Sequence, residues 1–238
     1  MQNYVFFDFN PRITWLYPVW NALNRTTSKN LREAYSKRRS ELGDRAIAVA
    51  TKLPILGTVT HRFNSDYQRL LKLAADDVEK IQTNRATGTV WRVRDERIAF
   101  ELLADIEAFI FESRSTYEIY GKFLRTFFED IFNRDLKEED IKAVLRDGGL
   151  EVEWTTLLRE ERILFFHDTA PWLALTFPGA DTTAPELLIV RQSVKNLDPE
   201  SFARLADYDR IYWGLGYALQ RMEQYILVEI QRYEKTGD

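Results

Sequence analysis

The sequence predicts a mainly α-helical protein: a bundle of four to five principal helices with one β-hairpin inserted before the last of them. Three observations lead to this fold class. Apolar residues recur every three or four positions along several long stretches, which is the spacing of one helix face. A single region, at about residues 170–194, is rich in β-forming residues on both sides of a turn-type loop. The 238 residues are enough to bury a large core, and the absence of cysteine excludes a disulfide framework.

The first helical region is strongly charged. Ser28 can cap a polar segment over residues 28–52, which we expect to form one or two helices. Pro54 and Gly57 are expected to interrupt it, since proline removes a backbone donor and glycine weakens a helix. A new helix is then predicted from about residue 64 to about residue 83.

The middle of the chain contains the clearest helical pattern. Residues 85–94 alternate around a glycine and are expected to form an extended connector. From 95 to 132 apolar residues return at helical intervals without a proline, which predicts one long helix with a kink expected near Ser113 or Gly121.

Two shorter helices follow. Residues 134–147 predict a short helix that is capped by Gly148 and Gly149. Residues 150–167 predict another helical stretch, and its C-terminal end contains one of the two histidines of the chain.

The β-hairpin at about 170–194 precedes the last predicted helix. Asp198, followed by proline and glutamate, is a typical helix start, and the pattern continues to about Tyr233. Gly214 and Gly216 lie inside this helix, where they indicate a close helix contact or a kink.

Charge divides the chain into two parts. The net charge is −4, but residues 1–62 hold 10 Lys and Arg against 4 Asp and Glu, or +6, which leaves −10 for the remainder. We therefore expect a basic N-terminal helical segment over 1–62, packed on a helical bundle over 63–238. The basic segment can contact phosphate, anionic lipid or an acidic partner, or can simply be a solvated face.

The sequence predicts a cytoplasmic protein without membrane contact. The N-terminus lacks the basic start and the continuous apolar run of a signal peptide. No apolar stretch approaches the roughly 20 residues that cross a membrane. The absence of cysteine fits a reducing compartment.

Several common catalytic motifs are missing. The chain has no Gly-rich phosphate loop, no nucleophile elbow and no H-E-x-x-H motif, and its two histidines are too few for a His-rich metal centre. Glu101, Asp105 and Glu112 are spaced by four and seven residues on the long predicted helix, so they share a face. They can form a carboxylate-only metal site or a solvated acidic stripe.

The stretch "RILFFHDTAPW" contains the candidate catalytic pair, Arg162 and His167. Five residues along an α-helix turn the chain by about 500°, so the two side chains leave the axis roughly 140° apart. If the helix ends at His167, the long Arg162 side chain can still converge with the imidazole. Such a pair suits RNA cleavage, because histidine acts as general acid or base, arginine holds a phosphate, and the 2′-hydroxyl is the internal nucleophile.

A purely structural role of His167 is the alternative. Phe165 and Phe166 would bury the segment, Asp168 would accept a hydrogen bond from the ring, and the following proline and tryptophan would close the helix.

The order of these elements resembles the HEPN superfamily over about residues 65–235. The resemblance rests on the long acid-bearing helix, a helix that ends in the R-x4-H motif, and a final long helix. It implies a metal-independent endoribonuclease site at a symmetric dimer interface, with Arg162 and His167 as the catalytic pair. Glu112 would be the acidic partner and Asp105 the second choice, and Asp105 and Asp168 are the candidate substrate contacts.

Two functions remain open, beside a third possibility, a metal enzyme whose site is lined by Glu101, Asp105 and Glu112. The first is metal-independent RNA cleavage without a cofactor by a homodimer, with a regulatory protein as a further candidate partner. The second is a non-enzymatic α-helical module that binds a protein or a small ligand. Two departures from the family pattern favour the second function. Ile163 follows Arg162 where the family usually has a polar residue, and the surrounding domain is acidic.

Overall fold

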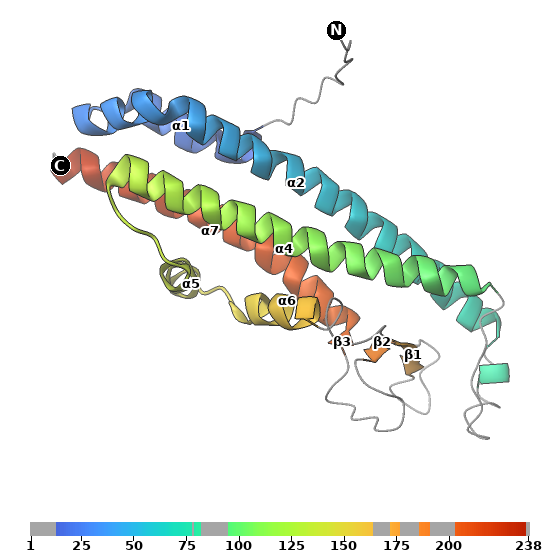
Figure 1. Ribbon diagram of the computed structural model, residues 1–238. Helices are drawn as coiled ribbons and strands as arrows, with labels where there is room; N and C mark the ends of the chain where they lie inside the picture. Colours follow the sequence, from blue (N-terminus) through green and yellow to red (C-terminus); the bar gives the residue numbers. More distant parts are fainter. Residues whose placement is uncertain are drawn as a thin grey trace, which may run out of the picture. The chain divides into compact units, whose positions relative to one another are not determined.

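The computed structural model describes residues 13–77, 79–81, 95–163, 172–176, 186–190 and 203–236. These residues form mainly α-helices with a small antiparallel sheet, which confirms the predicted helical class (Figure 1). The chain divides into two compact units: unit 1 comprises 1–54, 116–150 and 217–238, and unit 2 comprises 55–115 and 151–216. In the described parts, no helix combines the length and the apolar character that a membrane crossing requires.

The helix α2 (Lys29–Asp76) is continuous, so the expected interruption at Pro54 is wrong. A proline inside a helix costs about 3 kcal/mol. Val49 and Leu56 are buried on either side of Pro54, and burying each such side chain contributes about 1.5–3 kcal/mol. Tertiary packing therefore outweighs the local defect, and the expected boundary after residue 62 falls inside this helix.

The start of α2 agrees with the prediction. The Leu31 backbone N–H donates to Ser28 Oγ at 3.4 Å, which is the bond that an N-cap serine makes to the third helical residue. At the other end, α2 stops at Asp76, and residues 79–81 are also helical. The expected connector at 85–94 lies outside the described residues.

Unit 1 has an aromatic core. Trp15 lies in a short 3₁₀ helix (η1, Thr14–Leu16), and its ring centroid is 5.2 Å from that of Phe123. Trp20, in α1 (Tyr17–Arg25), stacks on Tyr35 of α2 at 5.4 Å. Phe123 belongs to α4 (Glu96–Phe132), which forms the predicted long helix and runs unbroken through the positions where a kink was expected. These edge and stacked contacts join α1, α2 and α4 of this unit.

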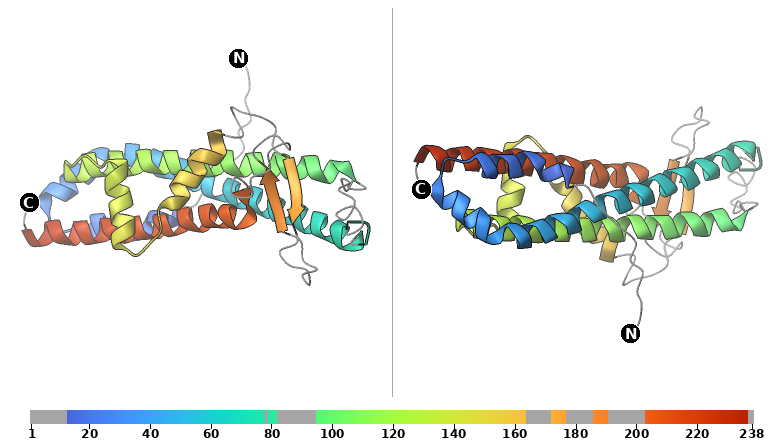
Figure 2. Two further views of the ribbon diagram at one scale, coloured as in Figure 1. Left: turned by 90° about the horizontal axis from the view of Figure 1, so that it is seen from below. Right: turned by 90° about the horizontal axis from the view of Figure 1, so that it is seen from above.

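The short helix α5 (Glu138–Asp147) also belongs to unit 1, where it lies across α4 and α7 (Leu205–Thr236) (Figure 2). Its C-terminal end has the predicted glycines: Gly148 is the C-cap, and Gly149 has a φ of 74°. Arg221 Nε of α7 donates to the Val144 carbonyl at 3.3 Å. A Cβ at position 148 would lie 2.5 Å from Arg221 Nε, so a larger residue there would displace this flexible side chain.

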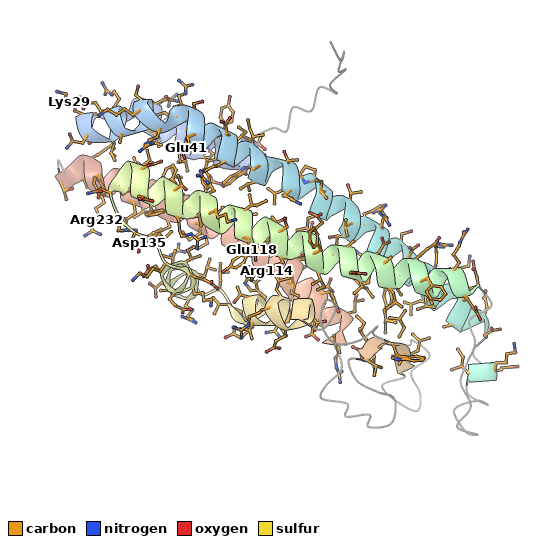
Figure 3. The ribbon with its side chains drawn as sticks, in the orientation of Figure 1. Lys29, Glu41, Arg114, Glu118, Asp135 and Arg232 are labelled. Carbon is orange, nitrogen blue, oxygen red and sulfur yellow. The ribbon has the colours of Figure 1, made fainter. Side chains whose placement is uncertain are left out.

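Ion pairs cover much of the basic N-terminal segment within unit 1. Lys29 lies 3.8 Å from Glu33, and Glu41 pairs with Arg38 at 3.4 Å and with Arg45 at 3.2 Å. Figure 3 marks Lys29 and Glu41 on α2. These cations are therefore partly neutralised by neighbours on their own helix.

Unit 2 contains α6 (Glu153–Ile163) and the sheet. The predicted hairpin is confirmed: β1 (Trp172–Thr176) and β2 (Glu186–Val190) pair antiparallel, with Trp172 opposite Val190. A third strand, β3 (Ala203–Arg204), pairs with β2.

The third strand corrects the expected start of the last helix. We placed residues 203 and 204 in that helix, but α7 begins at Leu205. Ala203 is buried opposite Ile189, so the strand covers the free edge of β2. The Arg204 backbone N–H donates to Asp207 Oδ2 at 2.9 Å, which ends the strand and opens the helix. The predicted cap at Asp198 lies outside the described residues.

Gly214 makes the expected close helix contact. A Cβ at this position would lie 2.4 Å from the Trp154 indole of α6, so only a glycine lets the two helices approach in this way. Gly216 has open space around it and makes no such contact.

Candidate functional site

The predicted catalytic pair is described only in part. Arg162 lies in the helix α6, which is described over Glu153–Ile163, so its backbone is helical as expected, while the predicted continuation of the helix to His167 lies outside the described residues. The side chain of Arg162, together with His167 and Asp168, lies outside the described residues. The convergence of the two side chains therefore stays a prediction.

A buried hydrogen bond anchors the turn that contains Arg162. Glu161 is fully buried, and the Tyr208 hydroxyl of α7 donates to its Oε2 at 2.9 Å. The Tyr208 ring packs between Phe63 and Phe109, with centroids 5.9 Å and 5.8 Å away. This aromatic cluster of unit 2 ties the end of α6 to α7 in one orientation.

The two acidic candidates lie on α4 of the same unit. Glu112 is half-buried. Asp105 is 1% exposed, and its Oδ1 accepts a short hydrogen bond from the Arg62 guanidinium of α2. Asp105 is thus engaged by an arginine that was not among the predicted site residues.

The carboxylate metal site considered from the sequence does not form. Glu101 Oε2 accepts from Arg69 Nη1 at 3.1 Å, and Glu101 Oε1 lies 3.2 Å from Arg97 Nε. With Asp105 bound to Arg62, two of the three acids already have arginine partners. Across the residues that the structure describes, no group of three or more His, Asp or Glu side chains could hold a metal ion.

An open hollow of about 320 Å³ lies over these ion pairs in unit 2. Five of its lining residues come from α2 and one from α4: His61, Arg62, Ser65, Asp66, Arg69 and Glu101. The five α2 positions are spaced by three and four residues, so they form one helix face. The sequence contains this spacing, but Glu101, the one lining residue from α4, is distant along the chain.

The two arginines of the hollow are oriented by carboxylates. Arg69 Nη1 donates to Asp66 at 2.8 Å and to Glu101 at 3.1 Å, while Arg62 donates to Asp105. The side chains of Arg62 and Arg69 are nevertheless 62% and 44% exposed. Exposed ion pairs contribute only about 0–1 kcal/mol to stability. Their main effect here is to orient guanidinium groups at an open surface.

Asp105 has an unusual environment for a carboxyl group. Burial raises its pKa above the ordinary value, the charge of Arg62 opposes this, and the nearby carboxyl groups of Asp66 and Glu101 raise it further. Its Oδ2 has no donor among the described residues, although Asp66 lies within hydrogen-bonding reach. Two carboxyl oxygens can share a hydrogen bond only when one of them carries a proton. Asp105 therefore takes up a proton more readily than an exposed aspartate.

The comparisons with known proteins add no family to this picture. No family model matches the chain, and no curated protein or solved structure matches it.

Proposed function

We propose that the protein is a metal-independent endoribonuclease of the HEPN type, in which Arg162 and His167 act at the end of α6. The observation that carries this proposal is the anchored part of α6 next to Arg162: the buried bond between Glu161 and Tyr208 holds the preceding residue of the helix against α7. An arginine that binds phosphate needs a rigid backbone to position its side chain. Glu112 belongs to the same compact unit.

The reaction is a transesterification. The His167 imidazole removes the proton of a 2′-hydroxyl, the freed oxygen attacks the adjacent phosphorus, and the 5′-oxygen leaves and accepts a proton. The Arg162 guanidinium binds the non-bridging phosphate oxygens and stabilises the charge that develops on them. Glu112 is the acidic partner that orients the pair. The proposal includes a homodimer, because the family that the sequence resembles forms its site between two copies.

The test is RNA cleavage by substituted proteins. His167→Ala and Arg162→Ala are each expected to lower the cleavage rate about a hundredfold or more. Arg159→Ala removes an exposed arginine one turn earlier on α6 and is the matched control, which should cleave at the normal rate. Cleavage should persist with a chelator and stop when the substrate lacks the 2′-hydroxyl. Equal cleavage by the wild type and His167→Ala would refute the proposal.

A melting experiment separates this function from the non-enzymatic alternative. If His167 acts in catalysis, His167→Ala leaves the melting temperature close to that of the wild type while cleavage is lost. A large drop in melting temperature without any wild-type RNA cleavage would instead assign the residue a structural role at the helix end.

A further inference from the structure

The hollow on α2 presents hydrogen-bond donors that its carboxylates do not use. Each guanidinium has five N–H groups. The bonds described above use Nη2 of Arg62 and Nη1 of Arg69, so the remaining nitrogens of both groups are without a bond to the described residues. Ser65 and His61 add a hydroxyl and a ring nitrogen on the same helix face.

We propose that this hollow binds the phosphate group of a ligand about the size of a nucleotide. The paired N–H groups of a guanidinium match two phosphate oxygens, and ion pairs with carboxylates hold the guanidinium groups of Arg62 and Arg69 in place. The inference uses no residue of α6, so it does not depend on the nuclease proposal.

The charges of the ion pairs at the hollow balance, and arginines engage its carboxylates. Three arginines, Arg62, Arg69 and Arg97, face three carboxylates, and each of those carboxylates has an arginine partner. The carboxylates are therefore not available as a set of metal ligands, in line with the absence of such a set in the described residues.

The dimensions of the hollow point to more than an isolated phosphate ion. His61 and Arg69 are eight residues apart, which corresponds to about 12 Å along the helix axis. The volume of about 320 Å³ is at the lower end of the range for small-molecule sites. One phosphate fills only part of that space, and a sugar or base can occupy the rest.

Two probes test the proposal on the full chain. Adenosine 5′-monophosphate is titrated by calorimetry, and a short 2′-O-methyl RNA, which cannot be cleaved through its 2′-oxygen, is titrated by fluorescence anisotropy. Arg69→Gln is expected to weaken binding about tenfold, the effect of losing one charge-assisted hydrogen bond. Arg69→Lys keeps the charge but loses the fork, so its affinity should be intermediate.

Arg210→Gln is the matched control. Arg210 is an exposed arginine of α7 in the same unit, and it pairs with Glu151 at 3.0 Å outside the hollow. Its substitution removes the same charge and should change the affinity by less than about twofold. Circular dichroism of each variant establishes that it is folded. Arg62 is left intact, because its removal would leave the buried Asp105 without a partner.

The two titrations distinguish a free nucleotide from an RNA strand as the source of the phosphate group. Binding of the monophosphate that depends on Arg69 supports a free nucleotide, and Arg69-dependent binding of the RNA alone supports a phosphodiester strand. The proposal fails if neither probe binds, or if Arg69→Gln and Arg210→Gln weaken binding equally. His167→Ala should bind both probes normally, which separates this site from the proposed nuclease site.

Discussion

The two units use arginine–carboxylate pairs in opposite ways. In unit 1, Arg134 Nη1 donates to Glu229 at 2.9 Å and Nη2 donates to the Tyr225 hydroxyl at 2.8 Å. Its guanidinium also lies over the Phe128 ring, 4.8 Å from the centroid. The Glu229 side chain is only 7% exposed. Aromatic rings flank this pair, Nη1 and Nη2 both have partners, and the Arg134 side chain is 38% exposed.

In unit 2 the corresponding groups remain open. The Arg62 and Arg69 side chains line the hollow, while the Asp105 that binds Arg62 is buried with one unpartnered oxygen. An arginine–carboxylate pair that is flanked by aromatic rings stabilises packing. The same kind of pair presents a binding surface where the guanidinium lines an open hollow. An incompletely satisfied polar cluster at an open surface is a candidate for function.

We expect the largest effect from a substitution that breaks the Arg134–Glu229 pair. Arg134→Ala leaves the buried Glu229 carboxylate with only the exposed Arg232, 4.0 Å away, so we expect the free energy of unfolding to fall by about 3 kcal/mol. Arg69→Ala, in the open network, should lower it by less than about 1 kcal/mol. Urea unfolding of both variants measures the difference. Equal losses would show that the two networks do not differ in the way described.

A second comparison concerns two glycines with close neighbours. Gly214→Ala in unit 2 drives a methyl group into the rigid Trp154 indole, and we expect a loss of about 2 kcal/mol. Gly148→Ala in unit 1 meets the flexible end of Arg221, which can move away, so the loss should stay below about 1 kcal/mol. Thermal unfolding of both proteins checks the order, and a larger loss for Gly148→Ala would contradict it.

The smallest expected effect is a pH dependence from Asp105. Its raised pKa means that the folded protein binds this proton more tightly than the unfolded chain does. The resulting stabilisation is complete below the ordinary aspartate pKa and is lost as the pH rises through the raised value. Relative to Asp105→Asn, the free energy of unfolding of the wild type should therefore fall over that pH range. Parallel pH profiles of the two proteins would argue against a proton on Asp105.

Local signals account for the parts of the fold that were predicted correctly. The long helix α4 follows from apolar spacing, the end of α5 follows from Gly148 and Gly149, and the hairpin follows from β-forming residues around a turn. Each of these patterns lies within a few residues of the element that it determines. The helical backbone at Arg162 was predictable for the same reason.

Contacts between distant residues decided the rest. Pro54 stays inside a helix because the side chains around it are buried, and β3 forms because the edge of β2 needs partners. The hollow depends on Arg62 meeting Asp105 across 43 positions and on Arg69 meeting Glu101 across 32. The sequence by itself determined most of the helical stretches, the caps at Ser28 and Gly148, and the residue types of the candidate site. Only the tertiary structure decided which charges meet, because periodicity reports the face of a helix and not its neighbour.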